Sequence, residues 1–249
     1  MSSPLDISHN LGKIGVLGGM GPHATVLFMQ RILEQTPAKD DCDHIPLLVD
    51  NNTQVPSRIK ALIEGNGPNP GPVLAQMART LEQAGAKALV MPCNTAHHYT
   101  PDIRQAISIP FLSMIELSAQ ELALRVDSGA SVGILASPAV KITGVFNAEL
   151  SRLQLNPVYP ASDAALLTAI KTLKASPADG DALEIVLGAA TELKSLGAEI
   201  ILIGCTEFSL LKDQIKQVHT AMDSLDILVA HSIEFSKSTK ISSGTGGAV

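Results

Sequence analysis

The sequence contains no tryptophan, and aromatic residues make up only 3% of its 249 residues. Its hydrophobic fraction is nevertheless 45%, with 17% charged residues, which is typical of a well-buried globular protein. The core must therefore be built from aliphatic side chains. A chain of this length can form one large domain or two modest ones.

Basic clusters, long apolar runs and cysteines are also scarce. A net charge of -6, without a long Lys/Arg cluster, argues against a nucleic-acid or anionic-membrane partner. No apolar run approaches the roughly 18 residues that a membrane span needs, and residues 1–10 lack the layout of a signal peptide. Three cysteines do not make a disulfide framework. We therefore expect a cytoplasmic protein.

Two of the cysteines directly follow short apolar runs. Cys93 closes the run that begins at Ala88, and Cys205 closes the run that begins at Glu199. An apolar run of four to eight residues that ends in a turn signal predicts a buried parallel strand. Each cysteine should then lie at the carboxyl end of a strand, where open α/β sheets bind their ligands.

The surroundings of these two cysteines indicate an internal duplication. The matched pairs are Leu81 with Leu193, Gly85 with Gly197, Ala86 with Ala198, Gly15 with Gly133 and Thr25 with Thr143. Each half begins with a strand, a small-residue turn and a helix, and later reaches a strand followed by Cys. The alternation predicts an α/β fold of two pseudo-symmetric lobes, each with a parallel sheet flanked by helices and with the active site between them.

We expect the first lobe to comprise residues 1–113 plus 221–249, with a C-terminal helix that returns to it and a flexible tail over 238–249. The second lobe would comprise residues 114–220. Near the start of the chain, the pattern predicts a strand over 13–18 and a helix over 22–35. That helix would carry Val26, Met29, Ile32 and Leu33 on one face. A second strand is expected over 45–49.

A pair of equivalent thiols permits an unusual reaction. A single cysteine in an apolar run is usually a small core residue. If the two lobes face each other, however, both sulfurs point into one cleft from opposite sides. One thiolate can then remove a proton from a carbon while the opposite thiol returns one to the other face, which inverts a stereocentre. An isolated thiol has a pKa of about 8.5, within reach of such chemistry.

Three segments resemble the signatures of the aspartate/glutamate racemase family: Gly18 to Pro22, Met91 to His97, and Gly204 to Glu207. The resemblance covers roughly residues 13–235. It implies an enzyme that needs no pyridoxal phosphate or other cofactor. It also implies that Cys93 and Cys205 serve as the acid/base pair.

The segment from Asn51 to Arg58 is similar to the aspartate racemase branch of that family, although Thr53 and Ser57 stand where the branch has proline and aspartate. Arg58 can hold a carboxylate in a bidentate fork. Asn94, Thr95 and Thr206 suit the α-carboxylate and the developing negative charge. The full set of expected substrate-binding residues is Met20, Asn51, Gln54, Arg58, Asn94, Thr95, Lys174, Thr206 and Glu207.

Other interpretations of these motifs stay open. His97 and His98 could bind zinc together with the cysteines, but no second pair of ligands accompanies them, so we expect packing or hydrogen bonding and no metal. The segment Gly19 to Ala24, with Asp50, loosely fits a dinucleotide site and hence an NAD(P)-dependent oxidoreductase. Pro22 removes an N–H from that turn, and the paired cysteines would go unexplained.

A non-enzymatic amino-acid-binding protein, a hydantoin racemase and a maleate isomerase are further alternatives. The favoured interpretation is a cofactor-independent racemase for aspartate first and glutamate second. We expect it to act on a small amino acid as a homodimer.

Overall fold

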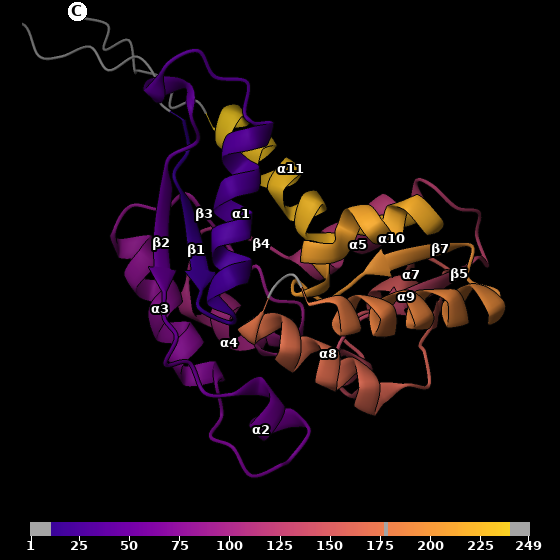
Figure 1. The fold of residues 1–249 in the computed structure, drawn as a ribbon. Helices are drawn as coiled ribbons and strands as arrows, with labels where there is room; N and C mark the ends of the chain where they lie inside the picture. Colours follow the sequence, from indigo (N-terminus) through magenta and orange to yellow (C-terminus); the bar gives the residue numbers. More distant parts are fainter. Residues whose placement is uncertain (1–10, 177–178, 240–249) are drawn as a thin grey trace, which may run out of the picture.

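The computed structural model of the chain describes residues 11–176 and 179–239. It contains two four-stranded parallel sheets, with strand orders β2-β1-β3-β4 and β6-β5-β7-β8, flanked by helices (Figure 1). The predicted α/β architecture of two lobes is confirmed. Most of the expected flexible tail, from residue 240 onward, lies outside the described residues.

The first lobe follows the predicted order of strands and helices. Its elements are β1 (Ile14–Gly18), α1 (Pro22–Gln35), the 3₁₀ helix η1 (Asp41–Asp43), β2 (Leu47–Asn51), α2 (Arg58–Leu62), α3 (Gly71–Gln83), β3 (Ala88–Val90), the 3₁₀ helix η2 (Thr95–Tyr99), α4 (Thr100–Ala106) and β4 (Phe111–Leu112).

The helix α5 (Met114–Ala123) leads into the second lobe. The elements that follow are β5 (Ser131–Leu135), α6 (Pro138–Thr143), α7 (Asn147–Arg152), β6 (Asn156–Val158), α8 (Asp163–Ala175), α9 (Gly180–Ser195), β7 (Ile200–Ile203), the 3₁₀ helix η3 (Phe208–Leu211), α10 (Lys212–Val218), β8 (Ala221–Asp223) and α11 (Ser224–Ser238). None of the helices in the described part of the chain is long and apolar enough to span a bilayer.

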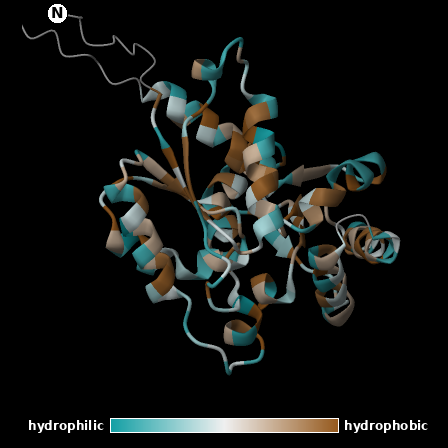
Figure 2. Ribbon diagram, turned by 60° about the vertical axis from the view of Figure 1, so that its left-hand side comes forward, coloured by the Kyte–Doolittle hydropathy of each residue, from teal (hydrophilic) through white to brown (hydrophobic). Residues whose placement is uncertain are grey.

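The aliphatic core lies on the central strands. Every residue of β1, β3 and β7 is buried, and Figure 2 shows hydrophobic residues concentrated on the strands. Continuous apolar burial is what a parallel sheet covered on both faces requires.

Both lobes contain the same helix-to-strand turn. Gly85 and Gly197 have φ values of 97° and 88°, in the left-handed region that favours glycine. The next residue, Ala86 or Ala198, donates its N–H to the carbonyl of a leucine in the preceding helix, at 3.1 Å in each lobe. The matched residues of the sequence therefore make the same local structure, so that the chain enters β3 and β7 through the same turn.

The inward face of α1 agrees with the prediction at Ile32 but not at Val26, Met29 and Leu33. Ala24, Phe28 and Ile32 are buried, whereas Val26 and Leu33 are 58% and 54% exposed and Met29 is also exposed. Both sets have helical spacing, so periodicity alone does not choose between them. Packing of Phe28 and Ile32 against β1 and α11 makes the choice.

The return of the chain to the first lobe begins later than expected. β8 starts at residue 221 but pairs with β7 in the second sheet. Only α11 crosses back, and it packs on both α1 and α5 (Figure 1). We therefore place this boundary between β8 and α11.

A buried cation joins the two lobes beside this crossing. Arg31 of α1 is 6% exposed. Its Nη1 donates to Asp223 Oδ2 at 2.6 Å and to Asp226 Oδ1 at 2.9 Å, and its Nη2 donates to the carbonyl oxygen of Ser209 at 2.6 Å. Burial raises the pKa of Asp223, and the adjacent Arg31 opposes that shift. The ionised carboxylate thus depends on Arg31.

We predict that Arg31→Met destabilises the protein by about 3–5 kcal/mol, because it leaves the buried Asp223 carboxylate without a counter-ion. The double variant Arg31→Met/Asp223→Asn removes the orphaned charge and should recover part of that loss. Urea unfolding of both variants measures the difference. Exposed ion pairs contribute less than about 1 kcal/mol to the free energy of unfolding. A loss of only that size in Arg31→Met would contradict the dependence of the Asp223 carboxylate on Arg31.

Candidate active site

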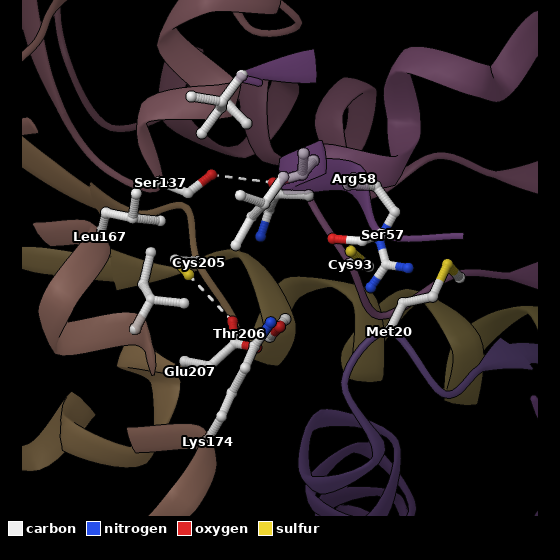
Figure 3. Close-up of a pocket in the computed structure, with 16 residues that line it drawn as sticks. Met20, Ser57, Arg58, Cys93, Ser137, Leu167, Lys174, Cys205, Thr206 and Glu207 are labelled. Carbon is white, nitrogen blue, oxygen red and sulfur yellow. Dashed lines mark hydrogen bonds and ion pairs between the residues drawn. The ribbon is translucent and has the colours of Figure 1, made fainter. Parts of the chain in front are cut away.

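The two predicted cysteines line one cavity between the lobes (Figure 3). Cys93 follows β3 and Cys205 follows β7, which hold equivalent positions in the two sheets. Their exposed fractions are 7% and 6%. The cavity volume is about 60 Å³, room for a few water-sized groups.

Cys93 lies in a tight turn at the end of β3. Its N–H donates to the carbonyl of Met91 at 2.8 Å. Burial raises the pKa of the Cys93 thiol. The Arg58 guanidinium and the Ala96 N–H act in the opposite direction, because both favour the thiolate.

Cys205 faces an anion instead. Its thiol donates to Glu207 Oε2 at 3.1 Å (Figure 3). Glu207 Oε1 lies 3.5 Å from Lys174 Nζ of α8. Burial and the charge of Glu207 together raise the pKa of Cys205 well above its ordinary value. The two thiols thus occupy equivalent places, but the largest charge effect on Cys93 comes from Arg58 and the largest on Cys205 from Glu207.

Arg58 is fixed by the loop that precedes it. The Ser57 hydroxyl caps α2 by accepting from the Lys60 N–H at 3.3 Å, so that Arg58 is the first helical residue. Arg58 Nη1 donates to the carbonyls of Val55 and Pro56 at 3.2 and 2.9 Å. The guanidinium is therefore held at the cavity before any ligand arrives.

Polar side chains tie the lobes together at the cavity. The hydroxyls of Thr95 and Ser137 are 3.0 Å apart. Asn94 Nδ2 donates to Ser224 Oγ at 3.1 Å, and that hydroxyl donates to the carbonyl of Ile203. Asn94 is 2% exposed, and its Oδ1 has no hydrogen-bond partner in the described part of the chain. A buried acceptor of this kind suits a donor group on a ligand.

Most of the predicted site residues come together here. The cavity is lined by Met20, Arg58, Cys93, Asn94, Thr95, Lys174, Cys205, Thr206 and Glu207. Asn51 and Gln54 lie outside it. Asn51 is exposed at the end of β2, and Gln54 is exposed in a turn where its side chain reaches Thr53.

The sequence interpretation missed several residues that line the cavity: Ser57, Ile59 and Ile63 in the first lobe and Ser137, Ala139, Leu167 and Ile170 in the second. Ser137 was detectable, because Ser137-Pro138 follows β5 at the small-residue turn that corresponds to the turn after β1.

The residues of the alternative zinc site and of the alternative dinucleotide site make hydrogen bonds within the protein. Both ring nitrogens of His97 are engaged by main-chain groups, Nδ1 with the Cys93 carbonyl at 2.9 Å and Nε2 with the Met114 N–H at 3.0 Å. Among the described residues, no three His, Cys, Asp or Glu side chains gather as metal ligands would. In the glycine turn, the Gly19 N–H donates to Thr25 Oγ1 at 2.9 Å and is not free for a pyrophosphate.

Comparison with known proteins identifies the fold. The structure matches Picrophilus torridus aspartate racemase with a TM-score of 0.81 and 27% identity, over 91% of this chain and 94% of that one. It also matches an aspartate racemase homologue from Pyrococcus horikoshii with a TM-score of 0.69 and 21% identity, over 91% and 100% of the two chains.

Curated relatives match over shorter segments. A broad-specificity amino-acid racemase of Bacillus subtilis is 30% identical over 44% of this chain and 48% of its own length. A glutamate racemase of Persephonella marina is 24% identical over 69% of this chain and 65% of its own length. The chain thus spans about half to two thirds of these relatives.

A sequence model of the Asp/Glu/hydantoin racemase family matches residues 17–232, which include the end of β1, both cysteines and most of α11. The resemblance seen in the cysteine motifs therefore extends over both lobes, and the chain belongs to the Asp/Glu/hydantoin racemase family.

Proposed function

We propose that this protein is a cofactor-independent racemase of acidic amino acids, aspartate first and glutamate second, with Cys93 and Cys205 as its acid/base pair. The observation that carries the proposal is the arrival of two thiols, from equivalent strands of two lobes, at one small cavity. The family match favours this reaction over the oxidoreductase alternative. The P. torridus neighbour, an aspartate racemase, favours aspartate.

The reaction requires two proton transfers on opposite faces of Cα. One cysteine, as thiolate, removes the α-proton, and the other, as thiol, donates a proton to the opposite face. The intermediate carries negative charge on the α-carboxylate, so fixed donors around a nearly dry cavity must stabilise it. Thr95, Thr206 and the backbone N–H groups that follow each cysteine supply such donors.

The charges that line the cavity match an acidic amino acid. Arg58 and Lys174 offer two cations for two carboxylates. Glu207 and the free Oδ1 of Asn94 offer acceptors for the ammonium group. With Glu207 counted, the charged side chains that line the cavity sum to one positive charge, which an acidic amino acid balances and a neutral one does not.

The direct test incubates the pyridoxal-free protein in D2O with each enantiomer of aspartate and of glutamate. We expect inversion together with deuterium at Cα. Cys93→Ser and Cys205→Ser should each lower the inversion rate by about 100-fold or more, the usual contribution of one general acid or base. Chiral chromatography and mass spectrometry measure both quantities. An unchanged rate in either variant contradicts the two-cysteine mechanism. Inversion of hydantoins, with no inversion of aspartate or glutamate, would contradict the proposed substrates.

We predict that Arg58→Lys raises KM for aspartate by about tenfold or more while the net charge stays the same. A lysine lacks the planar fork and cannot keep both main-chain hydrogen bonds while it binds a carboxylate. Steady-state kinetics with Arg58→Lys and Arg58→Gln measure the effect. Equal KM values in the wild type and Arg58→Lys would remove Arg58 from carboxylate binding.

Raised thiol pKa values predict that kcat/KM increases with pH across the neutral and mildly alkaline range, because the fraction of thiolate grows. Glu207→Gln removes a negative charge beside Cys205 and keeps an acceptor for its thiol. Loss of that negative charge favours the Cys205 thiolate, so the pH midpoint of Cys205 alkylation should fall by about one unit. Cys93 should shift less, because its pKa depends more on burial and on Arg58. A Cys205 midpoint that stays in place would refute the charge effect.

A further inference from the structure

The main-chain turns that carry the two cysteines are closed in different ways. In the second lobe the Cys205 carbonyl accepts the N–H groups of Phe208 and Ser209, at 2.9 and 3.2 Å. In the first lobe the corresponding N–H, that of His97, goes to the Asn94 carbonyl at 3.1 Å. The His97 ring takes over, with Nδ1 at 2.9 Å from the Cys93 carbonyl oxygen. A side chain thus replaces a backbone hydrogen bond at only one of the two thiols.

The protonation of this ring is fixed by its other partner. The N–H of Met114, at the start of α5, donates to Nε2 at 3.0 Å, so the ring proton must lie on Nδ1, where it is donated to Cys93. Burial lowers the pKa of His97 to about 4, which keeps the ring neutral.

The charged groups that act on the His97 ring are Glu116, which raises its pKa, and Arg104, which lowers it. Arg104 Nη2 and Glu116 Oε2 form an ion pair at 2.8 Å. The ring also packs on Phe111, with centroids 5.6 Å apart. His97 is therefore a rigid neutral link between α5 and the turn of Cys93.

We infer that His97 is a positioning residue for Cys93 and not for Cys205. Its neutral Nδ1–H ties the Cys93 carbonyl to the start of α5 and so holds the turn in which the Ala96 N–H faces the Cys93 sulfur. This inference rests on the proposed function only for its consequence in catalysis, since the placement of the Cys93 sulfur does not require a substrate.

Two substitutions separate the two hydrogen bonds of the ring. Asn places an amide N–H at the position of Nδ1, so His97→Asn keeps the donor to Cys93 and loses the acceptor for Met114. Gln places its amide near Nε2, so His97→Gln keeps the acceptor for Met114 and loses the donor to Cys93. Both variants lose the ring contact with Phe111, so the packing defect is shared.

The first experiment needs no substrate. Each protein is alkylated with iodoacetamide over a range of pH, and peptide mass spectrometry follows Cys93 and Cys205 separately. In His97→Gln we expect the Cys93 midpoint to rise by about half a unit to one unit, because the N–H that stabilises the thiolate is displaced. The facing charges Arg58, Glu207 and Lys174 are unchanged. The Cys205 midpoint should stay in place, and His97→Asn should resemble the wild type.

The second experiment compares aspartate enantiomers deuterated at Cα. With His97→Gln we expect kcat to fall by about tenfold to 100-fold, since a small misplacement of a reacting group has effects of that size. The primary isotope effect should grow for only one enantiomer, the one that Cys93 deprotonates. A variant that merely contains less folded enzyme would leave both isotope effects unchanged.

Three results overturn the inference: an unmoved Cys93 midpoint in His97→Gln, equal shifts at both cysteines, or equal damage in His97→Asn and His97→Gln. A further measurement uses the wild type alone, so it does not depend on a variant that folds. Histidine ¹⁵N shifts should report a neutral His97 with its proton on Nδ1 from pH 5 to pH 8, and the other tautomer would refute the link. If the wild type converts no amino acid, the proposed function fails, and alkylation still decides the role of His97.

Discussion

The cavity exists because polar side chains bind the two lobes to each other away from water. Arg31 reaches from α1 to Asp223 at the end of the second sheet and to Asp226 in α11. Nearer the cavity, Asn94 is hydrogen-bonded to Ser224 of α11. Each lobe has its own apolar core, with Cys93 at the edge of one and Cys205 at the edge of the other. Each lobe has an apolar core of its own, so the distance between the two thiols depends on these polar contacts between the lobes. The contacts persist because a buried polar group that loses its partner costs free energy.

The duplication supplies equivalent positions without equivalent chemistry. β3 and β7 each follow the same type of glycine turn and place the two cysteines at equivalent edges of the two sheets. Around the sulfurs the two halves then differ: Arg58 has the largest charge effect on Cys93 and Glu207 the largest on Cys205, and a histidine ring closes only the first turn. The backbone thus sets where the thiols lie, and side chains from neighbouring elements set how readily each ionises.

The residues that could be predicted from the sequence are those whose position follows from local pattern. The strand-Cys units were detectable because a continuous apolar run followed by a turn has one common structural solution. The buried face of α1 was not, since Val26 and Leu33 fit a helical stripe as well as Phe28 and Ile32 do, and only contact with α11 decides between them. The pairing of β8 with β7 and the hydrogen bond from Met114 to His97 join residues far apart in the chain. No local signal records such pairings.

A racemase has a special freedom to keep its two bases unlike each other. Enantiomers have equal free energy in water, so the equilibrium constant is one and kcat/KM must be equal in the two directions. Both directions cross the same transition states, so support given to one thiol lowers the barrier for both substrates alike. In the proposed two-cysteine mechanism, unequal surroundings of Cys93 and Cys205 therefore cannot favour one enantiomer at equilibrium. They change which step limits each direction and which protonation form of the free enzyme predominates. The residues around the two cysteines can therefore differ between the two halves of the duplicated fold.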